Sequence, residues 1–193
     1  MSQLCAEQGQ VLLHVARQVL MEQFGQEMPP AENQDDPELR QQHGVFVTLT
    51  KQGMLRGCIG SLLGLEPLLD GVRRQTINAA FHDHRFPPLT AEEVPDVRLA
   101  ISVLSQPQVL HYSDADELIQ KLRPRIDGVI LKQGQAGATF LPQVWNELPN
   151  PKVFLNQLCR KAGFASTAWQ TGDLTVQTYQ ATCFAEKDTV CQN

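Results

Sequence analysis

The chain has 193 residues, 42% of them hydrophobic, which is enough to bury the core of one large domain or two small lobes. The formal net charge of -5 and the scattered Lys and Arg residues argue against a nucleic-acid-binding protein, because phosphate neutralisation needs a clustered basic face. No apolar run approaches the roughly 18 residues that a membrane helix needs, and the N-terminal residues lack the pattern of a signal peptide. The composition predicts a soluble, cytoplasmic protein.

The five cysteines are odd in number and widely spaced along the chain. They form no C-x-x-C pair, so neither a zinc ribbon nor a thioredoxin motif is available. Dispersed thiols of this kind fit a reducing compartment. We therefore predict no metal site and no cofactor.

The first half of the chain predicts two helices and a hairpin. Apolar residues at i, i+4 spacing predict a helix over residues 8–24, which ends at Gly25. A proline-punctuated, acidic loop follows. Alternating residues in "VFVTLTKQGMLRGCIG" predict a hairpin that turns at Gln52–Gly53. Residues 64–86 then predict a helix with Pro67 near its start.

The second half adds strands and two more helices. "VRLAISVLS" is apolar on both faces and predicts a central strand, and Ser113 is the predicted N-cap of the next helix. Residues 128–142 predict a hairpin, residues 149–163 a helix closed by Gly163, and residues 174–186 one final strand. Residues 187–193 are predicted to be a flexible tail. The order indicates an α+β fold, a mixed or antiparallel sheet with flanking helices.

The stretch "LRGCIG" carries the best candidate for chemistry. Arg56 and Cys58 are two apart on the predicted strand, so they are expected to project on the same side, about 6.5 to 7 Å apart. A neighbouring guanidinium favours the thiolate, and Gly57 and Gly60 leave room for a ligand. Cys58 is the candidate nucleophile and Arg56 the candidate anion-binding group. The alternative is a buried, inert thiol in a tight strand.

Two other polar clusters are candidate binding regions. "HDHRF" contains Asp83 and Arg85, which either take part in binding or form a structural ion pair that fixes the loop. An H-x-H pair without a third ligand is weak evidence for a metal, although a histidine here could act as the general base for Cys58. Glu147 lies in "NELPNPK", at a predicted strand-to-helix junction where ligand groups often gather.

Several motifs together resemble one family. "GVFVTLTKQGMLRGCIG", "DHRFPPLT", "ISVLS", "TFLPQVW" and "FLNQLCRKAGF" occur in the order and approximate spacing of the AMMECR family, whose bacterial members are called AmmeMemoRadiSam system protein A. The "RGCIG" hallmark matches in full, whereas His84 replaces a proline in the usual "DPRFPPL". This departure weakens any metal or catalytic role for His84.

The resemblance covers nearly the whole chain, so it implies a single AMMECR-type domain over residues 1–193 with two subdomains. It implies an α+β fold of two unequal lobes that form a cleft, and association with a Memo-family protein and a radical SAM protein. It brings no settled activity and no cofactor, so whether the chain is an enzyme stays open.

Three hypotheses follow from these residues. In the first, the protein is an enzyme that uses Cys58, with Arg56 holding an anionic group of a small-molecule substrate. In the second, it is a non-catalytic adaptor or ligand-binding module, and Arg56, Asp83 and Arg85 form a surface for the partner proteins. In the third, these residues serve folding only, and Arg56 pairs with Asp83.

Overall fold

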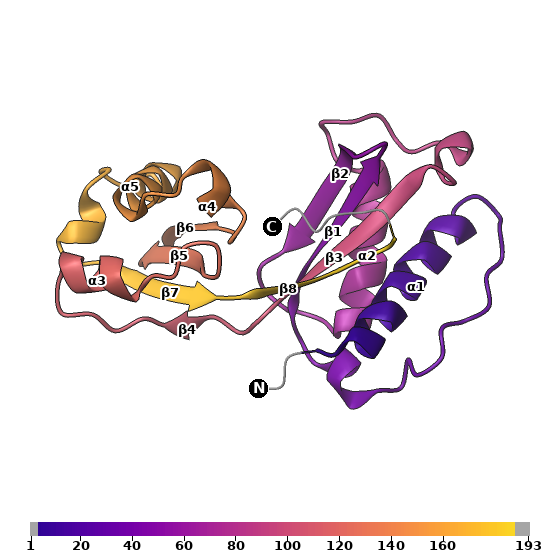
Figure 1. Cartoon of the computed structure of the whole chain (residues 1–193), viewed down its shortest axis with the longest axis horizontal. Coiled ribbons are helices and arrows are strands. Elements are labelled where there is room, and N and C mark those ends of the chain that lie inside the picture. The colour runs from indigo at the N-terminus through magenta and orange to yellow at the C-terminus, as the bar shows by residue number, and fades with distance from the viewer. Residues whose placement is uncertain (1–3, 188–193) are drawn as a thin grey trace. The chain divides into compact units, whose positions relative to one another are not determined.

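The computed structural model describes residues 4–187, which divide into two compact units (Figure 1). Unit 1 runs to Leu104 and resumes at Thr182, and unit 2 spans Ser105–Ala181. Each unit has its own four-stranded sheet and its own hydrophobic core. The predicted α+β fold is therefore confirmed, whereas the predicted cleft stays a prediction. Of the predicted tail, only Lys187 lies within the described residues.

Unit 1 packs two long helices against one face of its sheet (Figure 1). The sheet has the strand order β2-β1-β3-β8, so β2 forms one of its edges. The helices are α1 (Ala6–Glu22) and α2 (Leu68–Phe81), the strands are β1 (Gly44–Lys51), β2 (Met54–Ser61), β3 (Val97–Leu104) and β8 (Ala181–Ala185), and two 3-10 turns are η1 (Pro37–Arg40) and η2 (Ala91–Glu93).

The core of unit 1 follows from the two periodicities in the sequence. Every second residue of β1 is buried. Helix α1 buries two rows of residues at i, i+4 spacing, except that Val11 is half-buried. The rows are Val11, Val15 and Val19, and Leu12, Ala16 and Leu20. Helix α1 stops before Gly25, whose φ of +69° is a left-handed conformation that glycine adopts without strain. Helix α2 starts directly after Pro67, as predicted.

Unit 2 is a smaller sheet with the order β4-β7-β5-β6 and three short helices. Trp145 lies at the centre of its core, where it stacks on Phe154 with ring centroids 3.7 Å apart and donates a 2.7 Å hydrogen bond to the carbonyl of Asp127. The elements are β4 (Gln108–Val109), α3 (Ala115–Lys121), β5 (Gly128–Gln133), β6 (Ala136–Phe140), α4 (Val144–Glu147), α5 (Pro151–Lys161), η3 (Ala168–Gln170) and β7 (Thr175–Tyr179).

Two predictions about elements were wrong. The N-cap of α3 is Asp114, whose carboxylate accepts a hydrogen bond from the backbone N–H of Glu117, and not Ser113. The single final strand is two strands, because β7 belongs to the sheet of unit 2 and β8 to that of unit 1. The run breaks at Gln180, whose backbone N–H and C=O both bond to Ser105, where the chain first leaves unit 1.

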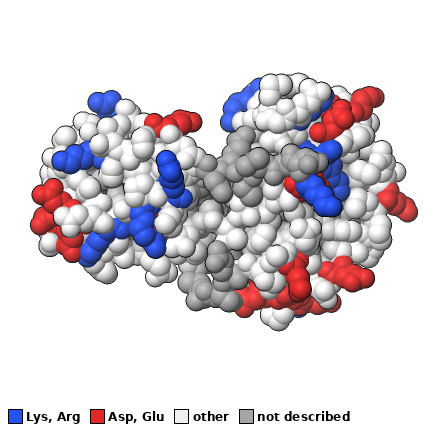
Figure 2. Space-filling view, viewed as in Figure 1, with Lys and Arg blue, Asp and Glu red and all other residues white. Residues whose placement is uncertain are grey.

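The surface carries charges of both signs. On the face drawn in Figure 2, Lys and Arg occur in separate small groups on both units, and acidic side chains gather over the part of unit 1 where α1 begins. Among residues 4–187, no helix is long and apolar enough to cross a membrane.

Candidate functional site

The hairpin β1–β2 places Cys58 through a bulge. Thr48 pairs with Cys58 and Leu49 with Gly57, but Thr50 pairs with Leu55, so Arg56 is the extra residue in β2. The regular alternation that predicted a shared face for Arg56 and Cys58 is thus interrupted at Arg56, and the two side chains have different partners.

Cys58 forms hydrogen bonds to three other residues through its sulfur, its backbone N–H and its carbonyl. Its half-buried sulfur accepts a hydrogen bond from the Thr48 hydroxyl at 3.3 Å. Its backbone N–H donates to Asp83 Oδ2 at 2.8 Å, and its carbonyl accepts from Arg85 Nη2 at 3.1 Å. Because β2 is an edge strand, the Asp83 and Arg85 side chains bond here to backbone groups that a neighbouring strand would otherwise take.

Asp83 and Arg85 form the ion pair that the sequence offered as one alternative. Arg85 Nη2 lies 2.7 Å from Asp83 Oδ2, and the Asp83 side chain is 4% exposed while that of Arg85 is 56% exposed. The hydrogen bond from Arg85 holds the pKa of Asp83 well below its usual range, against the opposing effect of burial. The same hydrogen bond raises the pKa of Arg85. Arg85 thus presents a fixed, permanently charged guanidinium beside Cys58.

Arg56 has an internal partner. Its Nε and Nη2 donate to the two carboxylate oxygens of Glu93 at 3.0 and 2.9 Å, and its side chain is only 10% exposed. The hydrogen bond from Arg56, assisted by Lys51, lowers the pKa of Glu93 to about 2. The hypothesis that Arg56 pairs with Asp83 is wrong, because Asp83 is occupied by Arg85.

The two glycines of the motif are explained by packing. A Cβ on Gly57 would lie 2.1 Å from the carbonyl oxygen of Ala79, so β2 can approach α2 this closely only without a side chain there. A Cβ on Gly60 would lie 2.3 Å from the ring of Phe46. The role of Gly57 and Gly60 in ligand binding stays a prediction. The atoms that lie closest to them belong to Ala79 and Phe46 of the protein itself.

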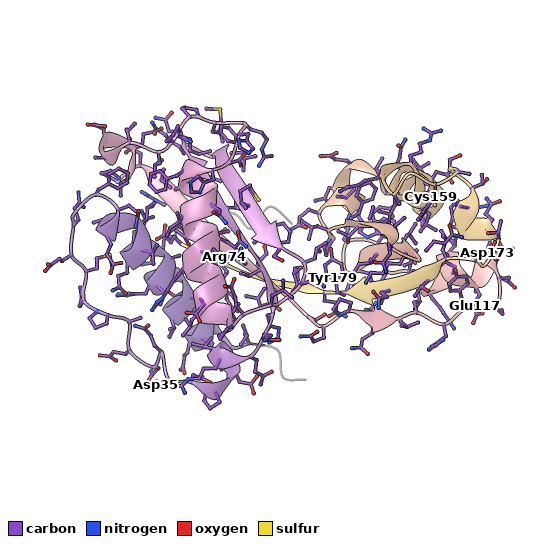
Figure 3. The ribbon with its side chains drawn as sticks, turned by 180° about the vertical axis from the view of Figure 1, so that it is seen from behind. Asp35, Arg74, Glu117, Cys159, Asp173 and Tyr179 are labelled. Atoms are coloured by element: carbon purple, nitrogen blue, oxygen red, sulfur yellow. The ribbon has the colours of Figure 1, made fainter. Side chains whose placement is uncertain are left out.

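The remaining candidate residues lie apart from this cluster. Glu147 is exposed at the end of α4 in unit 2. His82 and His84 are exposed, and no group of three or more His, Cys, Asp or Glu side chains suited to a metal occurs within residues 4–187. Cys159 is buried in the core of unit 2, as predicted, and lies on α5 in Figure 3. Cys183 is disulfide-bonded, so the prediction that the five cysteines are dispersed thiols is wrong for this residue.

Sequence reasoning missed two residues of the site, Thr48 and Glu93. Glu93 had a local signal, because Thr90 and Glu93 have the S/T-x-x-E spacing of a capping box, which the structure contains. Thr48 had none, since its position opposite Cys58 depends on the bulge.

Comparison with known proteins places this arrangement in a family. A family model described as AMMECR1 matches residues 13–184. This range includes every residue of the Cys58 cluster, which consists of Thr48, Arg56, Cys58, Asp83, Arg85 and Glu93. The chain belongs to the AMMECR1 family. The resemblance seen in the motifs is thereby confirmed over nearly the whole chain.

Relatives of known sequence or structure match most of the chain. A protein of Thermofilum pendens is 36% identical over 200 residues, covering 96% of this chain and 93% of the relative. A protein of Methanothermobacter thermautotrophicus is 35% identical over 185 residues, covering 95% and 96%. The crystal structure of the uncharacterized protein PH0010 from Pyrococcus horikoshii is similar with a TM-score of 0.79 and 32% identity, covering 95% and 94%.

Proposed function

We propose that this AMMECR1-family protein is a cytoplasmic, cysteine-dependent enzyme in which Cys58 reacts with a small anionic substrate, and that it acts with Memo-family and radical SAM proteins. One observation carries the proposal: the Cys58 thiol is hydrogen-bonded to a hydroxyl and tied through its own backbone to an exposed guanidinium. The association with the partner proteins is supported by the family motifs alone.

Arg85 suits the anion-binding role better than Arg56 does. The Arg56 guanidinium is buried and bonded to both oxygens of Glu93, so a substrate anion would have to displace an internal carboxylate. Arg85 is more than half exposed, and among residues 4–187 only the Nε and Nη2 of its side chain donate hydrogen bonds, to Asp83 and Cys58, which leaves the Nη1 donors for an anion. The proposal therefore keeps Cys58 as the nucleophile and assigns the anion to Arg85.

The reactivity of Cys58 toward charged and neutral alkylating reagents tests this assignment. Iodoacetate and iodoacetamide differ mainly in charge, so the ratio of their rates reports the field at the sulfur. We expect Arg85→Gln to lower the iodoacetate-to-iodoacetamide ratio at Cys58 about fivefold, equivalent to about 1 kcal/mol of lost attraction. Peptide mass spectrometry after timed quenching measures the ratio at each cysteine.

Two internal controls sharpen the measurement. Arg74, which lies on α2 in Figure 3, has a 52% exposed side chain in an ion pair with Glu66, and Arg74→Gln should leave the ratio at Cys58 unchanged. Cys5 is exposed and should show the same ratio in all variants. A ratio at Cys58 that does not respond to Arg85→Gln would remove the anion-binding role of Arg85.

An adaptor is the second candidate, because the hydrogen bond to the Cys58 sulfur comes from a hydroxyl and not from a histidine or carboxylate that could serve as its base. The adaptor hypothesis predicts that Cys58→Ser leaves function in cells intact, while Arg85→Gln abolishes co-purification with the Memo-family and radical SAM proteins. The enzyme hypothesis predicts that Cys58→Ser abolishes function and leaves co-purification intact.

A further inference from the structure

One hollow of unit 1, away from the Cys58 cluster, has its own set of charged side chains. It has a volume of about 530 Å³, within the range of small-molecule sites. It is formed where α1, the segment before β3 and the end of β8 meet, and we call it the basic groove. Its lining residues are Arg17, Met21, Gln26, Val94, Pro95, Arg98, Glu186 and Lys187.

One ion pair of the basic groove is internal. Arg17 donates to both carboxylate oxygens of Glu186, at 3.0 and 2.5 Å, and also to two backbone carbonyls. Glu186 additionally accepts the backbone N–H of Leu99 at 2.9 Å. Arg17 and Glu186 therefore neutralise each other, and both are fixed by the backbone around them.

Two further cations of the basic groove have no carboxylate partner among residues 4–187. Arg98 donates to the carbonyl oxygens of Pro95 and Val97, at 2.8 and 3.2 Å, and within residues 4–187 neither Arg98 nor Lys187 belongs to an ion pair. The groove thus carries three cationic side chains against one carboxylate. On a chain with a net charge of -5, this is a local reversal of sign. Figure 2 shows a compact group of basic side chains over the end of β8.

Apolar groups complete the basic groove. Met21 is half-buried, Val94 belongs to the core, and Pro95 adds a rigid apolar surface. Gln26 supplies an amide that can donate or accept a hydrogen bond. A ligand that satisfied this lining would place a negative group between Arg98 and Lys187 and an apolar body against Met21 and Pro95.

We propose that the basic groove binds a small organic anion, a carboxylate or phosphate monoester with an apolar body. The excess positive charge sets the sign of the ligand, and the volume and apolar wall set its size and character. The proposal is independent of the reaction at Cys58, so Cys58→Ser should bind the same ligands with unchanged affinity.

A pair of matched probes tests this binding. Calorimetric titration of the full chain with 4-phenylbutyrate should give saturable binding, while the neutral 4-phenylbutanamide should bind at least about fivefold more weakly, because it lacks the negative charge that would pair with Arg98 and Lys187. Competition by inorganic phosphate would support the proposal and show that the groove also accepts phosphate. Equal binding of acid and amide would overturn the proposal.

Variants locate the site. Arg98→Gln and Lys187→Gln should each weaken 4-phenylbutyrate binding about fivefold. Arg160→Gln, at an exposed position of α5 in unit 2, should leave it unchanged. Thermal unfolding of each variant shows whether it is folded before titration. If Arg98→Gln and Lys187→Gln are folded and bind as tightly as Arg160→Gln, the anion is not held in the basic groove.

Discussion

Replacing Gly57 with alanine is expected to lower the free energy of unfolding by about 3 kcal/mol, the upper end of what overpacking usually costs. The added Cβ would lie 2.1 Å from the Ala79 carbonyl oxygen. Neither group can rotate away, because one belongs to the backbone of β2 and the other to the backbone of α2. Strand and helix must therefore separate, and urea denaturation followed by circular dichroism measures the loss.

Gly71→Ala is the matched control for this substitution. Gly71 lies on α2 and faces the same sheet, but a Cβ there would meet the end of the Val45 side chain at 3.1 Å. Alanine also favours a helix over glycine by about 1 kcal/mol, which offsets the tight contact. We expect Gly71→Ala to change stability little. Equal losses in the two variants would show that the contact with the Ala79 carbonyl is not what requires glycine at position 57.

The "RGCIG" motif thus contains residues with separate tasks. Gly57 and Ile59 lie on the side of β2 that packs on the helices, while Cys58 pairs with Thr48 on the other side. Arg56 is fixed by Glu93. A substitution of Gly57 that abolished function would accordingly report on folding, whereas conservative substitutions of Cys58 or Arg85 report on the site.

The elements of the fold were largely predictable from the sequence because they depend on local patterns. The i, i+4 rows of α1, the Gln52–Gly53 turn and the left-handed Gly163 each have a short-range cause. The division of residues 174–186 into β7 and β8, which belong to different sheets, was not predictable from local patterns. It depends on Ser105, 75 residues before Gln180 in the sequence.

The position of Cys58 depends on one inserted residue. Extending the Lys51–Met54 pairing without interruption would place Cys58 opposite Val47, which is fully buried in the core. The bulge at Arg56 moves the register by one, so Cys58 lies opposite Thr48 and on the other face. Alternation predicts which residues share a face only between Gly57 and Ser61, beyond the bulge, and it does not predict which face meets the helices. The partners of Cys58 were therefore beyond sequence reasoning.

Glu93→Gln is expected to lower the free energy of unfolding by about 2–3 kcal/mol at pH 7, because it leaves the buried Arg56 guanidinium without its counter-charge. The side chains of Arg56 and Glu93 are 10% and 18% exposed, so solvent screens the pair only weakly. Glu92→Gln is the matched control, since the neighbouring Glu92 is exposed and forms no ion pair within residues 4–187, so its loss should cost much less than that of Glu93. Denaturation of both variants under one buffer condition makes the comparison.

The pH dependence of stability distinguishes two causes of the loss in Glu93→Gln, the broken ion pair with Arg56 and poorer packing. The pKa of Glu93 is lowered in the folded state from 4.5 to about 2, so its contribution is fully present above about pH 4.5 and is lost as the pH falls toward 2. The difference in stability between the unaltered protein and Glu93→Gln should therefore shrink over that interval. Asp83, whose pKa is also lowered, contributes equally to both proteins and cancels in the difference. A difference that stays constant from pH 7 to pH 2 would show that Glu93 stabilises the fold through packing and not through the attraction between its carboxylate and the Arg56 guanidinium.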